Sequence, residues 1–72
     1  MNEVTFEITR RLGVITEHPT GWAKELNMVS WNGNSPKLDI RDWNPEHTQM
    51  GRGITLTEDE FRKVLNLGRD WQ

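Results

Sequence analysis

The sequence predicts a small α+β domain, in which four β-strands are followed by one C-terminal helix (ββββα). Three observations support this fold class. Apolar and polar residues alternate in several short segments, clusters of turn-forming residues separate these segments, and a helix-capping motif begins at Thr57. With 72 residues, the chain has room for a single domain, which we place over residues 1–72.

The first strand is expected over residues 4–16. Phe6 and Ile8 alternate with polar residues, and the same parity continues through Leu12 and Val14. A two-residue period places every second side chain on the same face of a strand. The sequence therefore predicts a strand that buries one face and ends before the turn that follows, which contains proline and glycine.

The second and third strands are expected to form a hairpin over residues 22–31 and 36–43. Between them, Asn32-Gly33 is a strong signal for a hairpin turn, here within a loop of four or five residues. The third strand has the clearest alternation, because Leu38 and Ile40 share one face. The opposite face carries cations, a carboxylate and an aromatic ring, namely Lys37, Asp39, Arg41 and Trp43.

The remaining segments predict a loop, a short strand and the helix. Residues 44–52 contain few apolar side chains and are expected to form an exposed loop, and residues 53–56 are expected to form the fourth strand. In the capping box that begins at Thr57, the hydroxyl accepts from the amide of Glu60, and the Glu60 carboxylate accepts from the amide of Thr57. The helix is expected to run to about Asp70.

The charge balance and the residue types present exclude several classes of function. Nine Lys and Arg residues against eleven Asp and Glu residues give a net charge of −2, whereas duplex-DNA-binding proteins are usually basic. The sequence has no cysteine, no histidine spacing typical of a metal site and no glycine-rich phosphate loop. His18 and His47 lie in hydrophilic, turn-like segments and are interpreted as solvated. We therefore expect no enzyme, no metal, no cofactor and no small-molecule substrate.

Hydropathy gives an expectation for the cellular compartment. The longest uninterrupted apolar runs have two residues, as at Val14-Ile15, which is far too short for a transmembrane helix or a signal peptide. The absence of cysteine also gives no reason to expect a secreted, disulfide-bonded scaffold. We therefore expect a cytoplasmic protein that does not bind membranes.

Aromatic and cationic residues form the most informative combination in the chain. If the predicted hairpin forms, Trp31, Lys37, Arg41 and Trp43 lie on one solvent-facing surface. Because nucleobases stack on indole rings and cations bind phosphates, this combination is typical of single-strand binding. Alternatively, the two indoles pack on each other or are buried by the following loop, and the cations only solubilise the face beside carboxylates. Lys24 shares the parity of the buried side of its strand, although a bulge would turn it outward.

The predicted helix indicates a second subunit. Its apolar residues cover more than one narrow stripe, which is more than a single small sheet needs. A chain of 72 residues without disulfides also buries little apolar surface by itself. We therefore expect a homodimer. The expected interface residues are Phe61, Val64, Leu65, Leu67 and Trp71.

The sequence resembles the positive cofactor four family of transcriptional coactivators in two motifs, Lys37-Leu38-Asp39-Ile40-Arg41-Asp42-Trp43 and Gly51-Arg52-Gly53-Ile54-Thr55-Leu56, which precede a capped helix. The similarity is greatest to the short bacterial YdbC-like branch and spans residues 22–67. The resemblance implies a curved, four-stranded antiparallel sheet and a homodimer formed through the helices. It also implies that single-stranded DNA binds to the curved sheets.

The same resemblance implies roles for particular residues. The aromatic residues that contact DNA in the family fall on Trp31 and Trp43, and its strand cations fall on Lys37 and Arg41. Arg52 matches the basic residue of the glycine-flanked strand. The implied role is to hold melted strands during transcription, replication or repair.

We therefore expect a non-enzymatic homodimer that binds single-stranded DNA with little sequence preference. The indoles are expected to stack on bases. The expected phosphate contacts are Lys24, Lys37, Arg41 and Arg52. Two alternatives stay open. One is single-stranded RNA on the same face, since stacking does not need a deoxyribose, and the other is a protein-interaction dimer whose tryptophans bind a partner chain.

Overall fold

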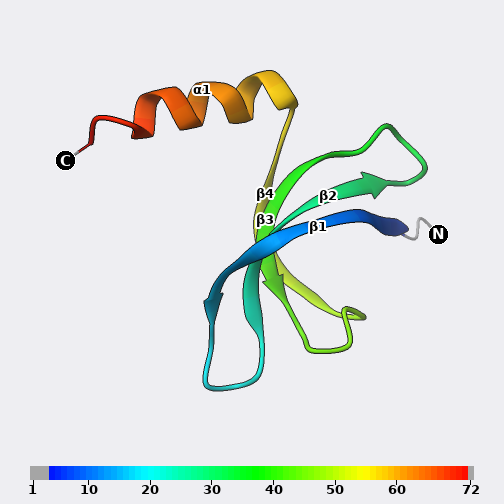
Figure 1. The fold of residues 1–72 in the computed structure, drawn as a ribbon. Helices are drawn as coiled ribbons and strands as arrows, with labels where there is room; N and C mark the ends of the chain where they lie inside the picture. Colours follow the sequence, from blue (N-terminus) through cyan, green and yellow to red (C-terminus); the bar gives the residue numbers. More distant parts are fainter. Residues whose placement is uncertain (1–3, 72) are drawn as a thin grey trace.

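The computed structural model describes residues 4–71 as one open, curved sheet with a single helix attached at its end (Figure 1). Residues 1–3 and 72, which the predicted domain includes, lie outside the described residues. The elements follow in the order β1 (Phe6–Glu17), β2 (Ala23–Trp31), β3 (Lys37–Trp43), β4 (Met50–Leu56) and α1 (Glu58–Gly68). The predicted ββββα class is therefore confirmed.

Each strand pairs antiparallel with the next strand in the chain, so the spatial order is β1-β2-β3-β4. The β2–β3 hairpin is regular, and Leu26 pairs with Ile40 near its middle. In its loop, residues 32–36, the φ angles of Asn32 and Gly33 are 51° and 76°. Positive φ at two consecutive residues is typical of a tight hairpin turn, which the Asn-Gly pair predicts.

The regular register gives the hairpin two different faces. One side, which we call the apolar face, carries Leu26 and Met28 of β2, Leu38 and Ile40 of β3, and Ile54 and Leu56 of β4. The opposite side, which we call the aromatic face, carries Glu25, Asn27, Val29 and Trp31 of β2 beside Lys37, Asp39, Arg41 and Trp43 of β3. The predicted division of β3 into two faces is therefore confirmed.

The most deeply buried side chains lie on the aromatic face, so the prediction that this face is turned to solvent is wrong for most of its residues. Val29 and Trp43 are fully buried there, together with the polar residues Glu25, Asn27 and Asp39. On the apolar face, Leu38 is buried, whereas the other side chains are half-buried or exposed. The monomer therefore leaves much of its apolar face accessible to another surface.

β1 departs from the predicted pattern of one buried face. Three register shifts against β2 interrupt the alternation of its side chains. As an edge strand, β1 also has a neighbouring strand on one side only. Phe6 and Ile8 are half-buried, but Leu12 and Val14 are exposed. The prediction of a continuous buried face is therefore wrong beyond Ile8.

The segment between β3 and β4 is more ordered than the predicted exposed loop over residues 44–52. Asn44 is buried, and its side-chain oxygen accepts from the backbone N–H groups of Thr48 and Gln49 at 2.9 and 2.8 Å. β4 also begins at Met50, three residues before the predicted start at Gly53. The predicted loop is therefore confirmed from its start at residue 44, but it is three residues shorter than predicted, and the buried side chain of Asn44 fixes its turn.

α1 begins at the predicted capping box. The Thr57 hydroxyl accepts from the backbone N–H of Glu60 at 3.1 Å, and the N–H of Thr57 donates to the Glu60 carboxylate at 2.8 Å. The helix ends at Gly68, slightly before the expected end near Asp70. In the described chain, residues 4–71, no helix is long and apolar enough to cross a membrane.

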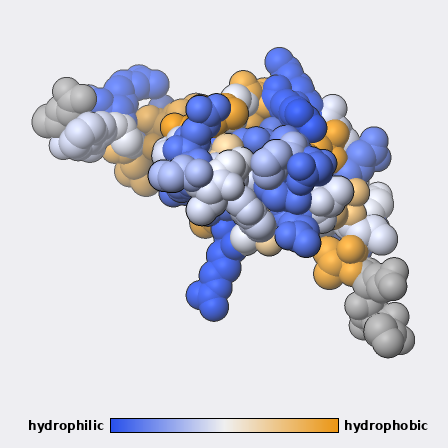
Figure 2. Space-filling view, turned by 90° about the horizontal axis from the view of Figure 1, so that it is seen from below, coloured by the Kyte–Doolittle hydropathy of each residue, from blue (hydrophilic) through white to orange (hydrophobic). Residues whose placement is uncertain are grey.

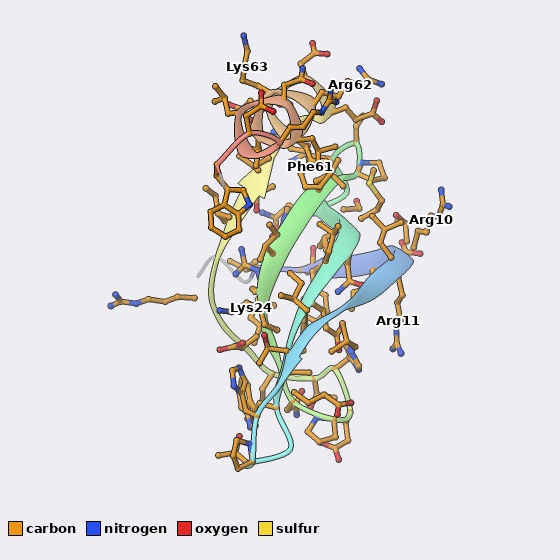
Figure 3. All side chains as sticks on the ribbon, turned by 60° about the vertical axis from the view of Figure 1, so that its left-hand side comes forward. Arg10, Arg11, Lys24, Phe61, Arg62 and Lys63 are labelled. Carbon is orange, nitrogen blue, oxygen red and sulfur yellow. The ribbon has the colours of Figure 1, made fainter. Side chains whose placement is uncertain are left out.

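The helix projects from the end of β4 instead of lying flat on the sheet (Figure 1). It contacts only β3 and β4, and none of its residues is buried. Figure 3 shows Phe61 on the side of α1 that faces the sheet, whereas Arg62 and Lys63 point away. Hydrophobic side chains are therefore visible at the surface over α1, at the left of Figure 2. Leu67 and Trp71 are 73% and 77% exposed.

β4 approaches β3 closely at Gly53, which pairs with Arg41. A Cβ atom on Gly53 would overlap the Cβ of Arg41 and the carbonyl oxygen of Ile40. These atoms belong to or adjoin the backbone, so they cannot swing aside as the end of a side chain can. At Gly13, by contrast, nothing lies within 4 Å of the position that a Cβ atom would take. The pairing of β3 with β4 therefore requires glycine at position 53.

We expect Gly53→Ala to lower the free energy of unfolding by about 1–3 kcal/mol, because β4 must move away from β3. Urea denaturation followed by circular dichroism measures this change. Gly13→Ala is the matched control, and its stability is expected to stay within about 0.5 kcal/mol of the wild type. Equal stability of the two variants would contradict the close approach of β4.

Candidate nucleic-acid interface

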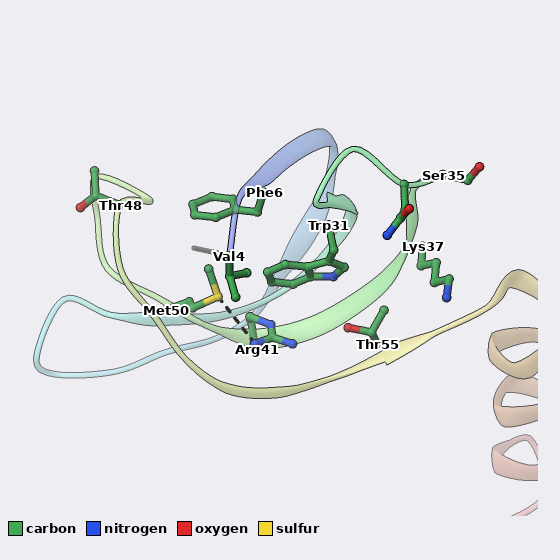
Figure 4. A pocket seen from close by; sticks show the side chains of 10 residues that line it. Val4, Phe6, Trp31, Ser35, Lys37, Arg41, Thr48, Met50 and Thr55 are labelled. Carbon is green, nitrogen blue, oxygen red and sulfur yellow. Dashed lines mark hydrogen bonds between the residues drawn. The ribbon is translucent and has the colours of Figure 1, made fainter. Parts of the chain in front are cut away.

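A pocket of about 660 Å³ opens on the aromatic face of the sheet. All four strands contribute to its wall, and the β2–β3 loop closes one side. Figure 4 shows aromatic, aliphatic and cationic side chains around one space. They include Phe6, Trp31, Lys37, Arg41, Met50 and Thr55. The pocket thus brings together three of the residues predicted to bind nucleic acid, Trp31, Lys37 and Arg41.

The Trp31 side chain forms the central part of the pocket wall. It pairs with Phe6 across β1 and β2, and the two ring centroids lie 6.1 Å apart at an angle of 53°. The guanidinium carbon of Arg41 lies 4.8 Å from the centroid of the Trp31 ring, and Figure 4 shows the ring above Arg41. The indole is half-buried. Its position is therefore fixed by a ring on one side and a cation on another, while the rest of the ring borders the pocket.

Arg41 is held by several hydrogen bonds. Its Nε and Nη2 atoms donate to the two carboxylate oxygens of Asp39 at 2.6 and 2.9 Å. Its Nη1 atom donates to the carbonyl oxygen of Gly51 at 3.3 Å. The side chain of Arg41 is 14% exposed, and that of Asp39 is fully buried. The Arg41 charge is therefore compensated within the protein, in agreement with the alternative in which the strand cations pair with carboxylates.

Trp43 lies beneath the pocket and not at its surface. Its exposed fraction is 0%, and its ring lies 5.1 Å from that of Phe6. On its other side, the ring of His47 stacks on it at 5.8 Å. The prediction that Trp43 offers a free ring to nucleobases is therefore wrong, because the β3–β4 loop covers it. We call the series Trp31, Phe6, Trp43 and His47 the aromatic row.

The other predicted phosphate contacts are distributed unevenly. Lys37 is exposed, lines the pocket and forms no ion pair with any residue from 4 to 71. Arg52 is exposed on β4 but does not line the pocket. Lys24 alternates with Glu25 along β2 and pairs with Asp42, so it lies on the opposite side of the hairpin from Trp31. The structure therefore does not bring Lys24 to this site.

Both histidines attach loops to the sheet. His47 Nε2 lies 2.9 and 3.0 Å from the carboxylate oxygens of Glu25, whose side chain is buried. His18 Nε2 lies 3.0 Å from Asp42 Oδ1, and His18 is half-buried. The prediction of solvated histidines is therefore wrong, because the turns that contain them fold back onto β2 and β3. Within residues 4–71, no group of three or more His, Asp or Glu side chains is placed to hold a metal ion.

Seven of the ten residues that line the pocket were not predicted from the sequence, among them Phe6, Met50 and Thr55. Phe6 reads as a core residue of the first strand, and Met50 falls in the predicted loop. The position of Thr55 could have been predicted from the sequence, because it alternates with Ile54 and Leu56 and therefore lies on the aromatic face. No comparable signal places Phe6 opposite Trp31, since that pairing depends on the register of β1.

Comparisons with known proteins give matches over most of this chain. The family model described as Transcriptional Coactivator p15 (PC4) matches residues 18–67, a range that contains β2, β3, β4 and most of α1. An uncharacterized protein of Treponema pallidum (strain Nichols) is 44% identical over 64 residues, which cover 85% of this chain and 75% of the relative. The family match includes Trp31, Lys37 and Arg41 but leaves out β1 with Phe6.

We expect Trp43→Ala to lower the free energy of unfolding by about 3–5 kcal/mol, because it empties a fully buried position beneath the pocket. Trp31→Ala should cost clearly less, since its ring is half-buried. Guanidinium denaturation at one fixed protein concentration compares the two variants. A larger loss for Trp31→Ala than for Trp43→Ala would show that the buried ring has been assigned to the wrong tryptophan.

Proposed function

The chain belongs to the PC4 family of transcriptional coactivators, and from this premise we propose that it binds single-stranded DNA with little sequence preference. The PC4 family consists of nucleic-acid-binding, non-enzymatic proteins. The observation that carries the proposal is the pocket of the aromatic face, where Trp31 and Lys37 line the same space. An aromatic surface beside a free cation suits a base and its phosphate.

Trp31 supplies the stacking surface in this proposal. Stacking of a base on an aromatic ring contributes about 1–3 kcal/mol and depends little on which base it is. Unpaired bases expose their faces, whereas a duplex hides them between neighbouring pairs. Because the net charge is −2, the protein has little general electrostatic attraction to DNA of either form. Base stacking then decides the preference, and only single strands offer their bases for stacking.

Lys37 supplies the phosphate contact beside the ring. Its exposed ammonium group has no carboxylate partner within residues 4–71, so it is available to a ligand. Arg52 is also exposed, and we assign it to phosphates that flank the pocket. Lys24 is left out because it lies on the other side of the hairpin. Trp43 is left out as a stacking surface because it is buried.

A homodimer formed through α1 is the second part of the proposal. Val64, Leu65 and Leu67 are 47%, 55% and 73% exposed, and the apolar face of the sheet is largely half-buried or exposed. Apolar surface gathered in this way is typical of an association site in a soluble protein. A second copy of the chain presents the same surfaces, so each copy buries those of the other. Because the apolar face lies opposite the aromatic face, association on that side leaves the pocket open.

We expect Trp31→Ala to weaken oligothymidine binding by about 1–3 kcal/mol, because the stacking surface is lost. Lys37→Ala should reduce the slope of log affinity against log salt by about 0.7, the value for one phosphate contact on a single strand. Fluorescence anisotropy with a labelled oligothymidine over a series of salt concentrations measures both quantities.

Lys63→Ala serves as the control for these variants, because Lys63 points away from the sheet on α1 and should leave affinity and slope unchanged. A duplex of the same length should bind more weakly than the single strand. Tight binding of the Trp31→Ala variant, or a preference for duplex, would refute the proposed mode of binding.

The proposed dimer is tested separately, by substitutions in α1 that change the oligomeric state. Leu65→Glu should convert the protein to a monomer, because association would bury an unpaired carboxylate in an apolar contact. Sedimentation equilibrium gives the molecular mass. Lys63→Glu introduces the same carboxylate on the outward side of α1 and should leave the dimer intact. A wild-type protein that sediments as a monomer would rule out this part of the proposal.

A further inference from the structure

We propose that Asp39 is a positioning residue that keeps Arg41 away from phosphates and fixes it as a planar support beneath Trp31. The inference rests on the proposed binding of single-stranded DNA and changes what Arg41 does there. A strand arginine in a nucleic-acid-binding face is ordinarily counted as a phosphate contact. Here its charge has a partner inside the protein, and its central carbon lies over the Trp31 ring, which receives the base in the proposed mode of binding.

The hydrogen-bond donors of Arg41 are largely occupied. A guanidinium group has five N–H donors in a fixed fork, and the fork edge formed by Nε and Nη2 suits a carboxylate or a phosphate. In Arg41 this edge is filled by the two oxygens of Asp39, at 2.6 and 2.9 Å. Nη1 donates to the Gly51 carbonyl oxygen and lies 3.7 Å from the sulfur of Met50. A phosphate can therefore bind this fork only by displacing Asp39.

Displacing Asp39 is unfavourable because its carboxylate is buried. Asp39 is 1% exposed, and its further partner is the hydroxyl of Thr55, which donates to Oδ2 at 2.8 Å. Its cross-strand neighbour Asn27 directs its amide group to Glu25 and not to Asp39. Arg41 is therefore the cation that compensates this carboxylate, and removing it would leave a charge buried without a counter-ion.

The fixed guanidinium then acts through its position over the Trp31 ring. Its central carbon lies 4.8 Å from the centroid of the Trp31 ring, within the range of a cation–π contact. The ion pair is formed before any ligand arrives, so the ring is held in place without a further loss of side-chain entropy on binding. Arg41 thus raises affinity by ordering the stacking surface, whereas the salt dependence comes from exposed cations such as Lys37.

The test is the salt dependence of oligothymidine binding in substituted proteins. Arg41→Ala should weaken binding about fivefold at every salt concentration, the loss of a cation–π contact of about 1 kcal/mol, and should leave the slope equal to that of the wild type. Arg41→Lys keeps the charge but loses the planar fork, so it should weaken binding to a similar extent. A slope that falls by about 0.7 in Arg41→Ala, or full affinity in Arg41→Lys, would overturn the proposal.

Asp39→Asn tests the positioning residue itself. It should steepen the slope by about 0.7, because the released guanidinium becomes free to bind a phosphate. An unchanged slope in a folded Asp39→Asn protein would overturn the proposal. If this variant does not fold, hydrogen exchange in the wild-type protein tests the same proposal. The Arg41 Nε–H signal in nuclear magnetic resonance spectra should stay protected from exchange with water when oligothymidine is added.

Loss of that protection on binding would show that a phosphate has taken the fork, and would overturn the inference alone. Failure of the wild type to bind oligothymidine at any salt concentration is a different result. It would refute the proposed function, and the role of Asp39 in binding would fall with it.

Discussion

The aromatic face is organised around one buried ion pair. Asp39 and Arg41 are two positions apart on β3, so the strand period brings them to the same side, where each compensates the charge of the other. Thr55 reaches the carboxylate from β4, and the Trp31 ring lies against the guanidinium. Gly53 permits this arrangement, because a side chain there would separate β4 from β3. The spacing of β3 and β4 and the position of the Trp31 ring in the pocket wall therefore both depend on the Asp39–Arg41 ion pair and its immediate neighbours.

The small size of the chain explains why its two faces differ. Deep burial is concentrated on the aromatic face, whereas the apolar face is mostly half-buried or exposed and no residue of α1 is buried. A larger protein would add a second layer there. In this chain the same apolar residues are available for association, and they lie on the side of the hairpin away from the pocket. Association can therefore use the apolar face and α1, whereas the deepest burial on folding and the pocket share the aromatic face.

Local signals explain what could be predicted from the sequence. The Asn32-Gly33 turn and the capping box at Thr57 each depend on residues close together in the chain, and both elements are where they were expected. The same reasoning placed Trp31 and the β3 cations on one face. Burial of Trp43 by the following loop is one of the alternatives that the sequence leaves open, and the sequence could not decide it because it depends on the contact of His47 with Glu25, a residue far away in sequence. The position of Phe6 depends on bulges in β1 that no local pattern reveals.

Because β1 lies at the edge of the sheet, residues on it can change the pocket wall without changing the inner strands. Phe6, the ring between the two indoles, comes from a peripheral strand that precedes the family-matched residues 18–67. A peripheral strand is bonded on one side only, so substitutions in it disturb the inner pairing little. The pocket rim can thus be reshaped while its floor stays constant. In this chain, a smaller or larger residue in place of Phe6 would therefore change the width of the pocket beside Trp31.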